Sequence, residues 1–457
     1  MGAGLVLLLL QPDPAPLVLR TLEAGGRDSG TDEPAERIAA AYAYEPWNTD
    51  HLAALAQAYA AQRDYAGVLF TLENLAQERP LSPEEINLRG SAYAALGQLE
   101  TAVEDWEAAW AAGGGDASAL SELASIYMDR GEWDQASAAL ATLQTLTPTN
   151  APVLYHLGLV RALVDPAAAR SALELAAALD ARYMSPTRTL IQALDARMGE
   201  ARDVGYARLG VAYLGVGELL LAETALGHAL TINPGYGEAL AYYAFVQARL
   251  GKPALAASQQ ARVLAPESPI VHYLNGVVWL VYGRPVMARA SLLEAAALDP
   301  ENAAFAVEIS HTYTAEDDLA QAEGWMLRAA EMAHDDPRFS ILLAQFYIDE
   351  GYRVQERGLP LAQALVMRYP DRAEVFDALG WAYFLLGETT DAVMALDRAL
   401  ALDPDLARAH YHRARVYEAE GQASFALWHY QQAEALDPEG TFGALARGEI
   451  DRLAGSR

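Results

Sequence analysis

The sequence predicts an all-α protein built as a solenoid of stacked helical hairpins, and three observations lead to this fold class. Alanine and leucine, which favour helices, recur throughout the 457 residues, whereas long β-branched runs typical of strands are scarce. A spaced pattern of small and aromatic residues returns about every 34 residues. Glycine and proline recur at fixed places in this pattern, where helices end. Repeats that bury their apolar faces only against their neighbours stack into an extended array.

The clearest copies of the repeat are adjacent and start at Ala373 and Ala407. The first carries Phe376, Leu379, Gly380, Tyr383, Gly387, Ala392, Leu396, Ala399 and Pro404. The second carries, at the same offsets, His410, Ala414, Tyr417, Gly421, Ala426, Tyr430, Ala433 and Pro438. Glycine inside a helix costs about 1 kcal/mol relative to alanine. Its return at the eighth position therefore indicates that the two helices of each hairpin must approach closely there.

The same frame starts at eleven places: Thr49, Pro83, Ala117, Ala151, Asp203, Gly237, Pro269, Ala303, Pro337, Ala373 and Ala407. In spacing and residue type this pattern closely resembles the tetratricopeptide-repeat (TPR) family. The resemblance implies a right-handed superhelical solenoid of TPR helical hairpins, whose inner face is lined mainly by the first helix of each unit. It also implies a non-enzymatic scaffold or adaptor that binds a partner protein or peptide in its concave groove.

The frame divides the chain into five expected segments. They are an apolar, flexible segment at 1–32, a TPR array with a capping half-repeat at 33–180, an inserted helix or irregular unit at 181–202, a second TPR array at 203–440, and a capping helix at 441–457. The step from Ala151 to Asp203 is 52 residues. Two interpretations stay open there: an inserted unit that bends the solenoid, or a boundary between two arrays. The unit at Gly237 is two residues short and the unit at Pro337 two residues long.

Residues Gly4 to Leu10 form an apolar run that is too short to span a membrane and lacks preceding basic residues. It is either the remnant of a signal or anchor, or a segment that packs on the first repeat. The compartment is therefore open between the cytoplasm and the cell envelope. If the run is a targeting remnant, the alternative function is an extracytoplasmic or membrane-anchored assembly factor for secretion or polysaccharide export.

Charge narrows the class of partner. The chain has 61 acidic and 32 basic residues, a formal charge of −29, and residues 1–160 alone hold 22 acids against 7 arginines. This field repels phosphate backbones and anionic lipids, so we expect no nucleic acid and no binding to membrane surfaces by charge. Acidic rims would instead steer a basic protein or peptide partner. The absence of cysteine excludes disulfides and thiolate chemistry.

The partner-binding groove is expected along the inner-face positions of the first helices. The central residues there are apolar or aromatic: Tyr155, Leu159, Val211, Leu214, Phe245, Ile270, Tyr273, Val277 and Leu280. His311 lies at the same face, and Trp381, Phe384, Tyr411 and Arg415 form a second patch. An exposed apolar stripe of this size usually marks an interaction surface. The open alternative is that tight winding or a neighbouring loop buries these side chains.

No catalytic, cofactor or metal-binding residue is predicted. His410 and His412 are two residues apart and face different sides of a helix. The carboxylate clamp known in TPR proteins requires lysine, and the single lysine, Lys252, falls in a turn. If the chain is instead an enzyme with an unrecognised site, that activity would depend on His311, with Glu308 and Asp349 as neighbours, or on the two-residue insertion at 352–360.

Overall fold

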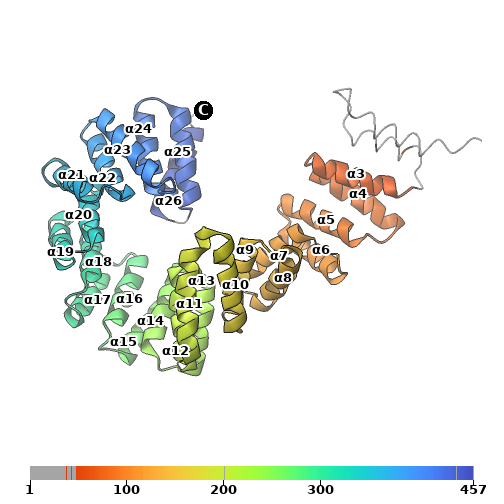
Figure 1. The fold of residues 1–457 in the computed structure, drawn as a ribbon, viewed down its shortest axis with the longest axis horizontal. Coiled ribbons are helices and arrows are strands. Elements are labelled where there is room, and N and C mark those ends of the chain that lie inside the picture. The colour runs from red at the N-terminus through yellow and green to blue at the C-terminus, as the bar shows by residue number, and fades with distance from the viewer. Residues whose placement is uncertain are drawn as a thin grey trace, which may run out of the picture. The chain divides into compact units, whose positions relative to one another are not determined.

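The computed structural model describes residues 48–114, 116–199, 201–438 and 440–455, together with Ile38 and Ala43 (Figure 1). These residues form helices and turns, and none of them belongs to a strand. The expected all-α fold of helical hairpins is confirmed. The apolar N-terminal run and nearly all of the expected capping half-repeat lie outside the described residues.

The chain divides into two compact units, Met1–Ile232 (unit 1) and Asn233–Arg457 (unit 2). The described helices of unit 1 are α3 (Asp50–Ala61), α4 (Tyr65–Glu78), α5 (Pro83–Ala95), α6 (Leu99–Ala111), α7 (Ala117–Arg130), α8 (Trp133–Leu146), α9 (Ala151–Arg161), α10 (Pro166–Leu179), a 3₁₀ turn at Ala181–Tyr183, α11 (Met184–Gly199), α12 (Arg202–Gly215) and α13 (Leu219–Ile232). Residues 181–202 thus hold a short turn and α11. That they separate two arrays stays a prediction.

Unit 2 continues with six hairpins and a last helix. Its helices are α14 (Gly237–Arg249), α15 (Leu255–Leu264), α16 (Pro269–Val281), α17 (Pro285–Leu298), α18 (Ala303–Thr314), α19 (Leu319–Met332), α20 (Pro337–Asp349), a π-helical turn at Val354–Gly358, α21 (Leu359–Arg368), α22 (Ala373–Leu385), α23 (Thr389–Leu402), α24 (Ala407–Ala419), α25 (Ala423–Leu436) and α26 (Thr441–Gly455). None of the helices in the described ranges is long and apolar enough to cross a bilayer.

The repeat frame predicted the start of every first helix. Nine of the eleven begin at the predicted residue, and α3 and α12 begin within one residue of it. The small eighth residue explains why the frame is strict. A Cβ atom added at Gly276 would lie 2.6 Å from Cγ of Leu292, and one at Gly158 would lie 2.6 Å from Cγ of Leu173. The two helices of these hairpins are therefore in direct contact at position eight.

In unit 1 the insertion interrupts the sequence of hairpins but not their packing. Helix α11 contacts both α10 and α12. The hydroxyl of Tyr213 in α12 donates to the carbonyl of Leu159 in α9, at 2.5 Å. The indole Nε1 of Trp133 in α8 donates to Oγ1 of Thr224 in α13, at 2.9 Å. The α12–α13 hairpin therefore lies against the hairpins that precede the insertion.

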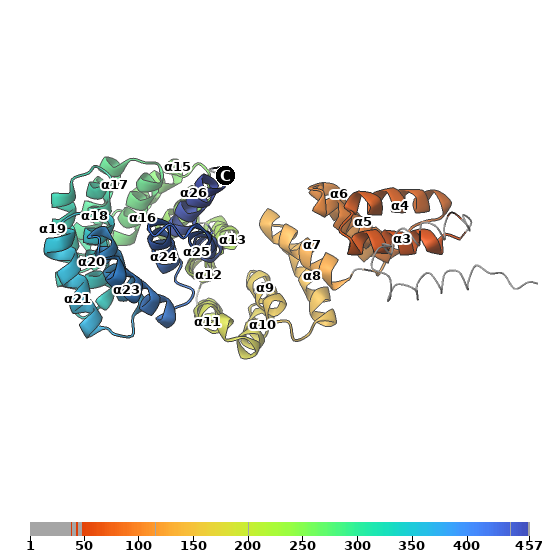
Figure 2. The same ribbon diagram turned by 90° about the horizontal axis from the view of Figure 1, so that it is seen from above.

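At the C-terminal end of unit 2, α26 packs on α24 and α25 (Figure 2). Ala446 of α26 is buried, and Phe442 and Leu453 pack against the cluster that contains Tyr411 and Tyr430. Helix α26 therefore covers an apolar surface that the last hairpin would otherwise expose.

Candidate partner-binding site

The residues expected to line the groove in unit 1 differ in how far their side chains are exposed. Leu159 has no exposed surface and Tyr155 is only 7% exposed, whereas Val211 is 37% exposed and Leu214 is half-buried. Tyr155 is covered by the ring of Tyr183 from the inserted segment, whose centroid lies 4.6 Å away. Tyr155 and Leu159 thus form part of the packing of unit 1.

In unit 2, Phe245 from α14 and Tyr273, Val277 and Leu280 from α16 are all half-buried; we call these four residues the central patch. Phe245 and Tyr273 pack in a cluster between the two helices, and the ring of Tyr273 lies 5.3 Å from that of Phe305. Burial, with a smaller effect of Glu308, raises the pKa of Tyr273 to about 12. Its hydroxyl therefore stays a neutral hydrogen-bond donor at physiological pH.

His311 is half-exposed, and its Nδ1 lies 3.3 Å from Oε2 of Glu308. Asp349, the other expected neighbour of His311, forms an ion pair with Arg408 at 2.7 Å. Within the described ranges, no group of three histidine, aspartate or glutamate side chains is arranged to hold a metal ion.

The second expected patch contains three stacked rings, those of Phe384, Trp381 and His412, which we call the ring stack. The centroids of Trp381 and Phe384 are 5.0 Å apart, with an angle of 17° between the ring planes. On the other side of Trp381, the imidazole of His412 lies 4.3 Å away and is almost parallel, at 9°. Trp381 and Phe384 are half-buried, whereas His412 is buried. One face of the half-buried indole of Trp381 therefore packs against the buried imidazole of His412.

A buried ion-pair network fixes the orientation of this imidazole. Asp377 has no exposed surface and accepts hydrogen bonds from Nδ1 of His412 and Nε of Arg408, both at 2.7 Å. Arg408 also donates to Asp349 at 2.7 Å. Burial acts to raise the pKa of Asp377, but His412 and Arg408 outweigh it, so the pKa lies below its usual value. The ionised carboxylate holds the proton of His412 on Nδ1.

The edge of the ring stack is formed by α24 and α26. Phe442 of α26 meets the ring of His412 edge-on at 5.6 Å, and the guanidinium of Arg408 lies over its face at 5.3 Å. Tyr411 is buried and accepts a hydrogen bond at 3.3 Å from Arg415, whose side chain is partly exposed. Tyr411 is thus part of the packing, while the positive charge of Arg415 lies beside the hydroxyl of Tyr411 and 3.9 Å from Oε1 of Glu449.

The sequence did not single out His412, although it did place it on a different face from His410. Its position, the sixth of the repeat, lies between the predicted inner-face positions. A signal was nevertheless present: Asp377 and Arg408 occupy inner-face positions of two consecutive units, and opposite charges at such positions predict an ion pair.

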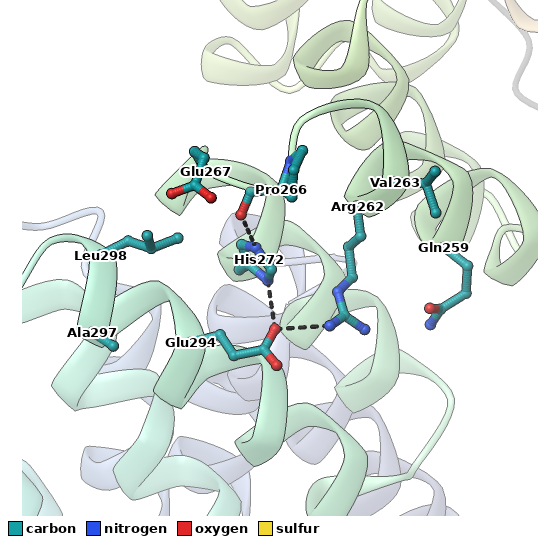
Figure 3. Close-up of a pocket in the computed structure, with 9 residues that line it drawn as sticks. All are labelled: Gln259, Arg262, Val263, Pro266, Glu267, His272, Glu294, Ala297 and Leu298. Carbon is teal, nitrogen blue, oxygen red and sulfur yellow. Dashed lines mark hydrogen bonds and ion pairs between the residues drawn. The ribbon is translucent and has the colours of Figure 1, made fainter.

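A hollow of about 620 Å³ lies elsewhere in unit 2, between α15 and α17 (Figure 3). Figure 3 shows Arg262 and His272 both directed at the carboxylate of Glu294. Nη2 of Arg262 and Nδ1 of His272 lie 2.7 and 2.8 Å from Oε2 of Glu294, and Nε2 of His272 lies 2.7 Å from the carbonyl of Pro266. The carboxylate of Glu294 therefore already has its partners within the chain.

Comparison with known proteins identifies the repeat. Residues 93–163 match a family model described as tetratricopeptide repeat, and residues 380–421 match one described as TPR repeat. No curated protein matches the sequence significantly.

Several solved structures are similar in fold. A tetratricopeptide repeat protein from Parabacteroides merdae is 15% identical, with 55% of this chain and 98% of that chain covered and a TM-score of 0.46. Yeast Tom70 is 14% identical, with 97% of both chains covered and a TM-score of 0.45. Cut9, solved in a hetero-tetramer with Hcn1, is 16% identical, with 98% of this chain and 97% of that chain covered and a TM-score of 0.38.

The two matched segments belong one to each compact unit, and the first helices between and around them keep the same frame. The chain is a tetratricopeptide-repeat protein, of the family that typically serves as protein-binding scaffolds.

Proposed function

We propose that this protein is a non-enzymatic scaffold and that unit 2 binds a partner protein or peptide on the face formed by its first helices. The observation that carries the proposal is the ring stack, in which Trp381 stays half-buried while the imidazole of His412 against it is held by Asp377. Tryptophan and arginine are enriched among the residues that dominate binding energy at protein interfaces. Here Arg415 lies in the neighbouring first helix, α24.

The buried network supports binding because it orders the site before a partner arrives. Asp377 and Arg408 hold His412, and His412 holds Trp381, so little side-chain freedom is left to lose at the anchor. Ordering a flexible side chain at an interface costs about 0.5–1.5 kcal/mol. A partner would place an apolar side chain against Trp381 and Phe384, with an acidic or carbonyl group toward Arg415. The central patch would contact a further apolar side chain.

A photo-crosslinking experiment tests the site directly. A benzoylphenylalanine residue replaces Phe384 in the ring stack, and in a matched control it replaces Phe425 in the second helix α25, where the side chain is 59% exposed. We expect a native extract to give a specific adduct with the Phe384 probe and not with the Phe425 probe. Adducts of equal yield at both positions would show that the contact does not depend on the first-helix face.

The affinity of variants for the partner identified by crosslinking is the second test. Trp381→Ala should weaken binding by about 2 kcal/mol or more, the loss typical of an anchoring residue. Trp428→Ala removes an indole that is 51% exposed in α25 and should leave the affinity unchanged. For the central patch, the double variant Phe245→Glu, Tyr273→Glu should also weaken binding, with the fold checked by circular dichroism. Retention of full affinity in both variants would exclude the first-helix face of unit 2.

A further inference from the structure

Unit 1 contains a second concave site of different chemistry. A cavity of about 440 Å³ lies against α7, α8 and α9 and is closed by Glu218, the residue that precedes α13. The polar residues that line it include Ser121, Ser125, Asp129, His156 and Glu218. Two of these, Ser121 and Ser125, occupy inner-face positions of the first helix α7.

The cavity exists because hairpins on both sides of the insertion pack together. Glu218 belongs to the turn between α12 and α13, far along the chain from α7 and α9. The hydrogen bond between Tyr213 and Leu159 holds α12 on α9, and the one between Trp133 and Thr224 holds α13 on α8. These two contacts fix the start of α13 and therefore the place of Glu218 at the rim of the cavity.

Two buried carboxylates elsewhere in the chain are each paired with an arginine. Asp105 forms an ion pair with Arg89 at 2.6 Å, and Glu323 forms one with Arg353 at 3.0 Å. By contrast, in the described part of the chain no hydrogen bond or ion pair engages the side chains of Asp129 and Glu218, and the lining includes no arginine or lysine. Asp129 is exposed, whereas Glu218 is half-buried. A half-buried carboxylate without a partner is costly, and an incoming cation would remove that cost for Glu218.

The pKa values of two residues that line the cavity reflect their burial and the surrounding charge. Burial raises the pKa of Glu218, and the negative charge of Asp129 raises it further. Burial also lowers the pKa of His156, which lines the cavity from α9. His156 therefore stays neutral near pH 7 and can accept a hydrogen bond through one ring nitrogen. Glu218 therefore lacks a nearby positive charge that would favour its ionised form.

We propose that this cavity binds the guanidinium or ammonium group of a basic side chain from a partner polypeptide. Asp129 and Glu218 supply the opposite charge, and Ser125 and His156 supply further hydrogen-bond acceptors. A polypeptide source is favoured because Asp129, Ser121 and Ser125 are exposed along one face of α7, so that the cavity opens onto a surface that an extended chain can follow. The surplus of acidic residues in 1–160 would attract such a basic segment. This site is independent of the ring stack in unit 2.

The test uses the full chain and three probes: a capped Gly-Arg-Gly peptide, its citrulline counterpart, which is neutral but similar in shape, and agmatine. Binding is measured by titration calorimetry and by ligand-observed NMR. We expect the arginine peptide to bind at least about tenfold more tightly than the citrulline peptide, the factor that one lost charge pair of about 1.4 kcal/mol produces. Equal binding of the two peptides, or no binding of either, would overturn the proposal. Agmatine binding as tightly as the arginine peptide would replace the polypeptide ligand with a small amine.

Variants locate the site. Glu218→Gln and Asp129→Asn keep the shape of each side chain and remove its charge, so each should weaken arginine-peptide binding about tenfold. Glu104→Gln, which removes an exposed carboxylate of α6, is the matched control and should bind as the parent does. Glu218→Gln should also raise the melting temperature of the free chain, because it removes a carboxylate that is unpaired there. Unchanged binding in both cavity variants would place the cation elsewhere.

A pH series gives a further readout of the same contact. Because the pKa of Glu218 is raised in the free chain, affinity for the arginine peptide should increase with pH through that value as the carboxyl ionises. The titratable groups facing Glu218 are Asp129 from α7 and Tyr155 and His156 from α9. In Glu218→Gln this increase should flatten, and an unchanged pH profile in that variant would contradict the assignment of Glu218.

Discussion

Replacing Asp377 by asparagine provides the sharpest test of the ion-pair network beneath the ring stack. The carboxylate has no exposed surface and accepts two hydrogen bonds of 2.7 Å from cationic or ring donors. Removing one partner of a buried ion pair costs about 3–5 kcal/mol, because the other charge is left unpaired. Arg408 keeps its pair with Asp349, and asparagine still offers one carbonyl oxygen. We therefore expect the free energy of unfolding to fall by about 3 kcal/mol, the lower end of that range.

The assay is urea unfolding followed by far-ultraviolet circular dichroism, with Glu434→Gln as the matched control. Glu434 forms an ion pair of 2.8 Å with Arg447, but their side chains are 34% and 51% exposed. An exposed pair of this kind contributes about 0–1 kcal/mol. If Asp377→Asn costs no more than this control, the reasoning that burial makes the network strong is refuted.

The pH dependence of the free energy of unfolding provides a second test of the same network. The pKa of Asp377 is lower in the folded chain than the value of about 3.9 expected in the unfolded chain. The carboxylate therefore contributes stability that is fully present above about pH 4 and is lost as pH falls through the lower, folded value. The gap between the parent and Asp377→Asn should be constant from pH 5 to 7 and shrink below about pH 4. A gap that does not shrink would mean that the carboxyl is not ionised in the folded chain.

Three further predictions test the repeat and its ends. Gly276→Ala should destabilise the chain by about 1–3 kcal/mol, because the added Cβ would overpack against Leu292. Gly324→Ala, where an added Cβ meets nothing within 4 Å, should stabilise the chain by up to about 1 kcal/mol. Equal melting temperatures of the two variants would contradict this reasoning. Burial, with His410 and Arg413, lowers the pKa of His429 to about 4, so stability should fall by up to about 3 kcal/mol as pH drops from 6.5 to 4, and a His429→Gln variant should lack that component of the acid slope. Deleting residues 441–457 should lower the unfolding midpoint more than deleting residues 1–30, because α26 covers the apolar end of the last hairpin; equal midpoints would contradict its role as a cap.

Much of the fold could be predicted because one steric requirement recurs in every unit. Position eight must be small because the second helix lies directly against it: at Gly276 even an added Cβ atom would lie 2.6 Å from Cγ of Leu292. A small residue at that position therefore indicates that the two helices of the hairpin lie in close contact there. Gly131, with a left-handed φ of 70°, similarly marks where a first helix ends and the chain turns back. These are local constraints, and the spacing of residues in the sequence is enough to reveal them.

The candidate sites were less predictable, because they depend on which helix lies over which. Tyr155 and Tyr411 each occupy the fifth position of their repeat, one of the predicted inner-face positions. The position alone does not show which residues cover them. Tyr155 is covered by Tyr183 of the inserted segment, and Tyr411 is packed by Phe442 of α26. Both covering residues lie outside the repeat frame. His412 and Glu218 were missed for a similar reason, since each acquires its role from a residue of another helix.

The concave features of this chain lie next to places where the repeat departs from its frame, and there is a physical reason for this. In a regular stack each hairpin meets a neighbour of the same shape, so apolar surface is covered and little polar surface is left within reach of a ligand. The insertion before α12 breaks this match, and the unpaired carboxylate of Glu218 lies just after it. The hollow shown in Figure 3 adjoins α15, which has 10 residues where α17 has 14. For these two hollows, irregularity in the repeat is therefore the better guide, whereas Trp381 and Phe384 lie in the regular unit that starts at Ala373 and were indicated by the apolar inner-face positions.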